Sequence, residues 1–217
     1  MMLPRRPLAV VFDLDGTLID SEALVQEAYF AACAAFGVTM TDAQFLELVG
    51  MHREANNVSL RKFYGADFPV DAFREAARGV IGDSAAPLKP GAREVMDLLD
   101  ELGAPFGLAT SSHRPWVRRH LEAHNIAERF GAVVTREDVV HGKPDPEPYI
   151  MASAALGVTP SDILVLEDSH AGVRSAYAAG CMTVMVPDLL QPNEEMHAKA
   201  LVLASLHDVR RLLASRR

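Results

Sequence analysis

The sequence predicts an α/β fold: a doubly wound parallel sheet into which an all-helical domain is inserted after the first strand. Short apolar runs that end abruptly in polar residues recur along the chain, and runs without alternation are typical of strands buried on both faces. Helical patterns that end in glycine separate most of these runs. Residues 18–86 interrupt this rhythm, because they contain helix starts but no convincing strand.

The elements of the core follow from these patterns in chain order. The predicted strands are Leu8–Phe12, Phe106–Ala109, Ala132–Val134, Ile163–Leu166 and Met182–Val186. Glycines at the expected position just past a helix end close three helical patterns, which are Ala92–Leu102 before Gly103, Glu147–Leu156 before Gly157 and Ala171–Ala179 before Gly180. Strand, helix and strand at this spacing indicate right-handed βαβ units.

The insert shows helix signals of its own. One run starts at Ser21 and ends at Gly37, and Thr41 to Gln44 has the pattern of a capping box. A stretch rich in helix-breaking residues, 83–91, marks the return to the core. We therefore expect a core made of residues 1–17 and 87–217 and a helical cap made of residues 18–86.

Composition excludes several classes of protein. The 217 residues suffice for a core with a smaller insert, and 49% of them are hydrophobic, unlike a disordered chain. The 29 acidic and 21 basic residues give a net charge of −8, which opposes binding to nucleic acid. Cys33 and Cys181 lie in small apolar surroundings and are expected to be buried and reduced. The apolar run Leu8–Phe12 is too short for a membrane span. We expect a cytoplasmic monomer without a membrane contact.

Polar residues follow the predicted strands, where an open parallel sheet binds its ligands. They are Asp13-Leu-Asp15-Gly-Thr17, Thr110-Ser111-Ser112, Lys143 and Glu167-Asp168. Carboxylates gathered this closely repel one another by several kcal/mol at an effective dielectric constant near about 20. The cluster therefore predicts a hard divalent cation with oxygen ligands, and Mg²⁺ fits best.

These motifs resemble, in order, the four motifs of the haloacid dehalogenase superfamily. They are Asp13 to Glu22, Ala109 to Ser112, Gly142 to Pro146 and Leu166 to Ser169. Within the superfamily the chain is similar to the β-phosphoglucomutase-like branch, whose members carry a helical cap after the first strand of a Rossmann-like core. The tail, Met182 to Ser205, is similar to proteins of the pseudouridine 5′-phosphatase type.

The resemblance implies a role for each motif residue. Asp13 would be the nucleophile that forms an aspartyl phosphate, and Asp15 the general acid and base. Thr110, through its hydroxyl, and Ser111, through its backbone amide, would hold the phosphoryl oxygens. Lys143 would neutralise charge between Asp13 and the phosphate.

The same resemblance implies how the metal would be held. Mg²⁺ would bind the Asp13 carboxylate, the main-chain carbonyl of Asp15 and Asp168, with Glu167 as a ligand either directly or through water. The predicted activity is that of a Mg²⁺-dependent phosphatase acting on a small phosphomonoester, such as a sugar phosphate or a nucleotide-like compound.

Three alternative functions compete with a phosphatase. Asp15 argues against dehalogenation, because dehalogenases lack the second aspartate. In β-phosphoglucomutases a cap histidine restricts hydrolysis, and its position falls on Val25, which favours a phosphatase over a mutase. Gly50-Met-His-Arg53 resembles the mutase segment that bears a basic residue for the distal phosphate, so Arg53 would contact the part of the substrate that is not transferred. The alternative is that Arg53 is an ordinary exposed arginine on a helix. A non-catalytic, Mg²⁺-binding signalling protein is opposed by the length and by the insert.

Four further residues are expected to have structural and not catalytic roles. His120 and His124, four apart on a predicted helix, suit a solvated helix face better than a zinc site, since no third ligand is evident. Trp116 is expected to contribute to packing. His170 is expected to start a helix.

Overall fold

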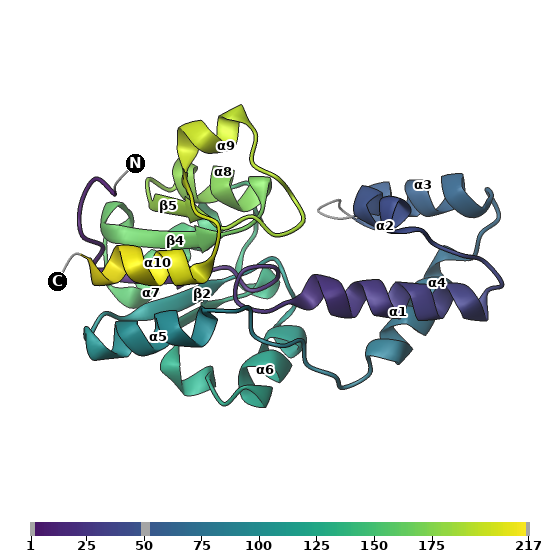
Figure 1. The fold of residues 1–217 in the computed structure, drawn as a ribbon, viewed down its shortest axis with the longest axis horizontal. Coiled ribbons are helices and arrows are strands. Elements are labelled where there is room, and N and C mark those ends of the chain that lie inside the picture. The colour runs from purple at the N-terminus through teal and green to yellow at the C-terminus, as the bar shows by residue number, and fades with distance from the viewer. Residues whose placement is uncertain (1–2, 49–52, 216–217) are drawn as a thin grey trace. The chain divides into compact units, whose positions relative to one another are not determined.

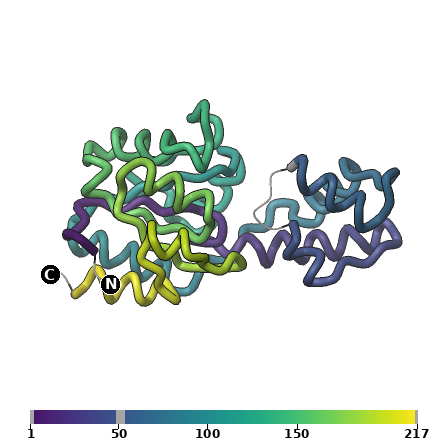
Figure 2. The backbone as a smooth tube through the Cα atoms, turned by 90° about the horizontal axis from the view of Figure 1, so that it is seen from above, coloured from purple at the N-terminus to yellow at the C-terminus, as the bar shows by residue number. Residues whose placement is uncertain are grey.

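A computed structural model describes residues 3–48 and 53–215 of the chain. The chain divides into two compact units, one made of residues 1–20 and 87–217 and the other of residues 21–86 (Figures 1 and 2). The division falls after Asp20, so residues 18–20 belong to the first unit and not to the insert. Ile19 forms a bridge with Leu88, and Lys89 N donates to the Leu18 carbonyl, which ties the two passing segments together.

The first unit is built on a six-stranded sheet with the order β3-β2-β1-β4-β5-β6, in which every pairing is parallel. This architecture confirms the predicted fold class. The strands are β1 (Ala9–Phe12), β2 (Phe106–Ala109), β3 (Ala132–Val134), β4 (Ile163–Glu167), β5 (Met182–Met185) and β6 (Leu201–Val202). The sequence reading missed β6, because a strand of two residues carries almost no periodic signal.

Helices cover the sheet on both faces, as Figure 1 shows. The alternation of side chains along β1 explains the two layers: Ala9 and Val11 pack in one cluster with α7 and α8, whereas Val10 lies beside α5 and α10. The helices of this unit are α5 (Ala92–Glu101), α6 (Arg114–Ala123), α7 (Glu147–Leu156), α8 (His170–Ala178), α9 (Glu194–Lys199) and α10 (Leu206–Ala214), with 3₁₀ turns at Ala127–Arg129, Arg136–Asp138 and Pro160–Asp162.

The predicted helix ends agree with the backbone. Gly103, Gly157 and Gly180 all have φ between 63° and 79°, the left-handed conformation that stops a helix. His170 begins α8, as expected, and the Ser169 side chain caps this helix by accepting a hydrogen bond from Gly172 N.

The described residues of the second unit form helices only: α1 (Ser21–Ala35), α2 (Asp42–Leu48), α3 (Arg53–Tyr64) and α4 (Val70–Ile81). The expected capping box is present at the start of α2. Thr41 N donates to Gln44 Oε1 at 2.9 Å, and Gln44 N donates to Thr41 Oγ1 at 3.2 Å. The unit has its own core, in which Phe45, Leu60 and Phe73 are buried, so its helices are held by packing independent of the sheet.

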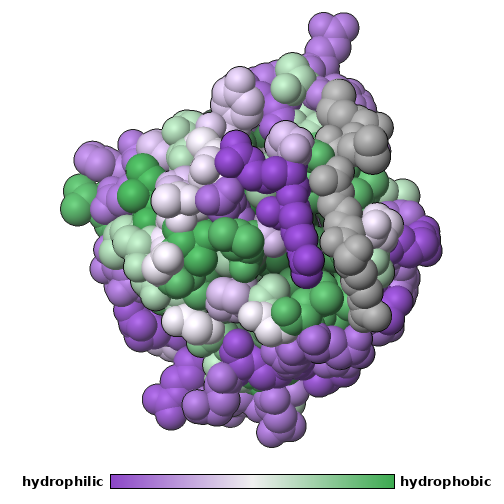
Figure 3. Space-filling model, turned by 90° about the vertical axis from the view of Figure 1, so that its left-hand side faces the viewer, coloured by the Kyte–Doolittle hydropathy of each residue, from purple (hydrophilic) through white to green (hydrophobic). Residues whose placement is uncertain are grey.

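Both cysteines are buried, as the sequence predicts. Within the described residues no helix combines the length and the apolar character that crossing a membrane requires; the cytoplasmic location stays a prediction. Figure 3 looks onto the core unit near the chain ends, where hydrophobic and hydrophilic residues are interspersed. A surface hollow of about 290 Å³ lies beside Met182 and Leu201, the first residues of β5 and β6. It is therefore at the amino ends of the parallel strands, away from the carboxyl ends that Asp13 and Glu167 mark.

Candidate active site

Lys143 joins the carboxyl ends of three strands. Its Nζ donates hydrogen bonds to Asp13 Oδ1 at 2.5 Å, to Glu167 Oε1 at 2.6 Å and to the carbonyl of Ala109 at 2.9 Å. Asp13 directly follows β1, Ala109 ends β2 and Glu167 ends β4. The parallel pairing of these strands brings their ends to the same edge of the sheet, so residues up to 130 positions apart share one ammonium group.

Burial and charge oppose each other at this ammonium group. Burial disfavours a charged Lys143, but the attraction of Asp13 and Glu167 outweighs it and raises the pKa of Lys143 above its ordinary value. Burial also raises the pKa of Asp13, which reaches about 7 because the negative charges of Glu167 and Asp15 add to it and Lys143 only partly offsets them. The lysine is therefore a permanent cation beside a carboxyl group whose charged form needs further support.

Glu167 is fully buried, and donors surround its carboxylate. Lys143 Nζ and Tyr149 OH donate to Oε1, at 2.6 and 2.7 Å. Asp168 N, Ser169 N and Ser169 Oγ donate to Oε2, all at 3.0 to 3.1 Å. Burial raises the pKa of Glu167, but Lys143 and these hydrogen bonds outweigh it and lower the pKa below its ordinary value. Glu167 is thus a stable anion whose lone pairs are largely engaged.

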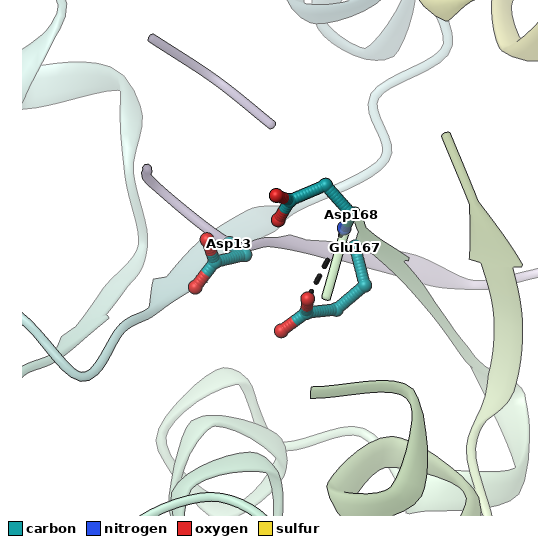
Figure 4. Close-up of side chains that lie close together, drawn as sticks. All are labelled: Asp13, Glu167 and Asp168. Atoms are coloured by element: carbon teal, nitrogen blue, oxygen red, sulfur yellow. Dashed lines mark hydrogen bonds between the residues drawn. The ribbon is translucent and has the colours of Figure 1, made fainter. Parts of the chain in front are cut away.

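Three carboxyl groups form a potential metal site. Each of Asp13, Glu167 and Asp168 offers one oxygen, and these oxygens all lie within 4.8 Å of one another (Figure 4). The pKa of Asp168 is raised well above its ordinary value, first by burial and then by the charges of Glu167 and Asp13. A cation would reverse this shift. An all-oxygen donor set with a surplus of negative charge fits Mg²⁺, so the residues present suit the predicted metal.

Gly16 leaves the space that Asp168 occupies. Its backbone φ is +81°, a value that residues with a Cβ rarely adopt. A Cβ at this position would also overlap the Asp168 carboxyl group. Thr17 Oγ1 donates to Asp168 Oδ1 at 3.2 Å from the same turn. The turn after β1 therefore needs glycine both for its conformation and for its close approach to the acidic cluster.

Asp15, in the same turn, makes two contacts that the sequence did not predict, although it had singled out both partner residues. Its carboxylate accepts hydrogen bonds from Ser112 Oγ at 2.5 Å and from Trp116 Nε1 at 3.0 Å. Trp116 is therefore more than a packing residue, in contrast to the prediction. The interpretation of His120 as part of a solvated face is wrong, because its side chain is buried against the Trp116 ring.

Thr110 and Ser111 follow β2. Thr110 is buried, and its amide extends the ladder to β3 by donating to the Val134 carbonyl at 3.0 Å. Its hydroxyl oxygen accepts a hydrogen bond from Ser112 N, also at 3.0 Å. Ser111 is exposed. The turn thus places a buried hydroxyl one residue after Ala109, which binds Lys143.

Two residues of the helical unit were singled out in the sequence, Arg53 and Val25. Arg53 begins α3, but its side chain and residues 50–52 lie outside the described part of the structure. Val25, at the position of the mutase histidine, packs against the hydrophobic core of the helical unit. Its side chain therefore has a structural role within that unit.

Comparisons with known proteins identify the family of the chain. The profile of the family described as haloacid dehalogenase-like hydrolase matches residues 10–186. The chain is 32% identical to hexitol phosphatase B of Escherichia coli O157:H7 over 96% of this chain and 97% of that protein. It is also 32% identical to a probable pseudouridine-5′-phosphatase of Drosophila melanogaster, over 94% and 92% of the two chains.

The fold has a solved counterpart in Thermotoga maritima, a protein assigned as a β-phosphoglucomutase. The two structures align with a TM-score of 0.80 and 28% identity, covering 95% of this chain and 98% of the other. Together the matches confirm the predicted family, its β-phosphoglucomutase-like branch and the phosphatase class of enzyme.

Proposed function

The chain belongs to the haloacid dehalogenase-like hydrolase family, and from this premise we propose that it is a Mg²⁺-dependent phosphatase that hydrolyses a small phosphomonoester through an aspartyl phosphate. The observation that carries the proposal is that Asp13 accepts a hydrogen bond from the Lys143 ammonium and lies within 4.8 Å of the Asp168 carboxyl group, with a second acid, Asp15, two residues further along the chain. The nucleophile, the metal ligands and the proton donor then lie at or just after strand ends, and the loop before α7 supplies the counter-charge, Lys143.

In the first step the Asp13 carboxylate attacks phosphorus, the ester P–O bond breaks, and Asp15 gives its proton to the departing alcohol oxygen. In the second step Asp15 takes a proton from water, which attacks the aspartyl phosphate and releases inorganic phosphate and free Asp13. Lys143 offsets the negative charge that builds up beside Asp13, and the Thr110 hydroxyl and Ser111 amide orient the phosphoryl oxygens.

Asp13, Asp168 and the Asp15 carbonyl are the ligands that we assign to Mg²⁺, which when bound supplies Lewis-acid stabilisation of the phosphoryl oxygens. Glu167 has a different function in this proposal. Since its oxygens already accept five hydrogen bonds, it supports Lys143 and contacts the metal through water at most. The positive Lys143 and the negative Glu167 then form a buried pair that fixes the ammonium group next to the nucleophile.

The substrate that we propose is a sugar phosphate or a nucleotide-like monophosphate, in keeping with the names of the relatives. Arg53 is proposed to contact the part of the substrate that is not transferred. Arg53→Ala should then lower kcat/KM for the best sugar phosphate by on the order of tenfold, and leave p-nitrophenyl phosphate hydrolysis almost unchanged, because that compound offers no second polar group.

Phosphate release from a panel of sugar phosphates, polyol phosphates and nucleoside monophosphates tests the proposal. Activity should vanish on exhaustive chelation, return with Mg²⁺, and be lost in a folded Asp13→Asn protein, because the amide is a poor nucleophile. Rapid quenching should trap a protein that has gained one phosphoryl group. Activity that survives chelation would refute the metal assignment, and activity of Asp13→Asn within about tenfold of wild type would remove Asp13 from the mechanism. Conversion of β-glucose 1-phosphate to glucose 6-phosphate without phosphate release would instead indicate a mutase.

A further inference from the structure

Both carboxylate oxygens of Asp15 are bound by side chains from the segment that follows β2. Ser112 Oγ donates to Oδ2 at 2.5 Å, and Trp116 Nε1 donates to Oδ1 at 3.0 Å. Ser112 lies in the turn before α6, and Trp116 lies in the first turn of that helix. Two donors on two different oxygens fix the plane of the carboxyl group as well as its position, which one hydrogen bond would not do.

The chemistry of these donors suits a group that must keep exchanging a proton. An indole N–H is a donor only, so Trp116 cannot remove the proton that Asp15 transfers. Each carboxylate oxygen has room for about two hydrogen bonds, so Trp116 and Ser112 leave acceptor capacity on both. The two hydrogen bonds therefore orient the Asp15 carboxyl group and leave it able to gain or lose a proton.

The indole is itself held on several sides. Its ring lies against the buried ring of His120, with 4.2 Å between centroids, and the Arg119 guanidinium lies 5.4 Å from the indole centroid. His120 Nδ1 donates a hydrogen bond to the Trp116 carbonyl at 2.8 Å, which holds the imidazole next to the indole. Aromatic and cation–π contacts of this kind restrict the rotation of a side chain. Trp116 therefore presents Nε1 to Asp15 from a preset orientation.

We propose that Trp116, together with Ser112, is a positioning residue that aims the Asp15 carboxyl group for proton transfer to the leaving oxygen. The inference rests on the proposed function, in which Asp15 is the general acid. Misplacing an acid lowers the rate most where the departing oxygen needs the proton most. A leaving group that is stable as an anion departs without help, whereas a basic one does not.

The test is the dependence of kcat/KM on the leaving group, measured with a graded series of aryl phosphates from p-nitrophenyl phosphate to phenyl phosphate. Trp116→Phe keeps an aromatic ring on His120 but removes the N–H. It should increase the ratio of kcat/KM for p-nitrophenyl phosphate to that for phenyl phosphate by on the order of tenfold over wild type. Ser112→Ala, which leaves α6 intact, should change the ratio in the same direction and keeps the test valid if Trp116→Phe does not fold.

Two further variants separate the possible outcomes. Arg118→Ala is the matched control, since Arg118 lies on the same helix and pairs with Glu122 on the surface, and its ratio should equal that of wild type. Asp15→Asn should show the largest change in ratio. An equal loss for all substrates in Trp116→Phe and Ser112→Ala, alongside a changed ratio in Asp15→Asn, would overturn the positioning role but leave the proposed function intact. An unchanged ratio in Asp15→Asn would refute Asp15 as the acid and overturn both.

Discussion

Replacing Gly172 by alanine should destabilise this protein, although the same change stabilises most helices. Gly172 lies within α8, where alanine is ordinarily favoured over glycine by about 0.5–1 kcal/mol. Here a Cβ would overlap the carboxyl carbon and both carboxyl oxygens of Glu167, which is completely buried. Because the overlap involves the whole carboxyl group, a small shift of the helix would not relieve it.

The magnitude follows from what Glu167 would have to give up. If the Glu167 carboxylate turns away, Lys143 loses its buried ion-pair partner Glu167. The hydroxyl groups of Tyr149 and Ser169 lose their hydrogen-bond acceptor as well. Removing one partner from a buried pair costs about 3–5 kcal/mol. The helix gain of up to about 1 kcal/mol offsets part of this. We therefore expect the free energy of unfolding to fall by about 2–4 kcal/mol, a large part of the stability of an ordinary domain.

Urea denaturation with linear extrapolation measures this difference. Gly79→Ala is the matched control, because Gly79 is also helical, in α4, and a Cβ there would meet nothing within 4 Å. It should leave stability unchanged or raise it by about 0.5–1 kcal/mol. Phosphatase activity should fall in Gly172→Ala and not in Gly79→Ala, since Lys143 depends on Glu167. Wild-type or greater stability of Gly172→Ala would refute the argument that the absent Cβ makes room for Glu167.

Three further changes should have measurable effects. Tyr149→Phe keeps the buried ring but removes the hydroxyl that donates to Glu167 at 2.7 Å, so the free energy of unfolding should drop by about 1.5–3 kcal/mol in urea, and no drop would contradict a contribution from this bond. Burial lowers the pKa of His120, so as pH falls through about 6.5 the unfolded chain takes up a proton before the folded protein does. Between about pH 7.5 and 5.5 wild type should therefore lose stability relative to His120→Leu. A difference in unfolding free energy that stays constant over this range would argue against a buried neutral ring. Gly16→Ala should abolish Mg²⁺-dependent turnover and weaken Mg²⁺ binding in calorimetry, because its Cβ would displace Asp168; wild-type binding would show that the turn adapts.

The sequence alone determined the fold class and most element positions. Strands buried on both faces must be continuously apolar, so runs such as Ile163–Leu166 are visible without a structure, and the glycines that end helices mark the intervening segments. It also indicated that polar residues such as Asp13 and Asp168 follow the strands directly and that Lys143 lies a few residues beyond the third strand, so they would gather where a parallel sheet brings its carboxyl ends together. These are local signals combined with one general rule of sheet geometry.

Only the tertiary structure decided how the side chains at that edge engage one another. The strand order β3-β2-β1-β4 lets Lys143 donate hydrogen bonds to Asp13 and Glu167 together. The sequence of a single segment does not reveal which strands pair. Nor does any single segment show the five hydrogen bonds that the Glu167 carboxylate accepts, one of them from Lys143.

Trp116 and His120 illustrate the physical reason. Their spacing of four predicts a shared helix face, but hydropathy along one helix does not say whether that face meets solvent or a carboxylate from a turn about 100 residues earlier. The hydrogen bond from Trp116 to Asp15 depends on the docking of α6 against the turn after β1. Such contacts arise from the summed packing of the whole core, and for this reason sequence patterns of short range do not contain them.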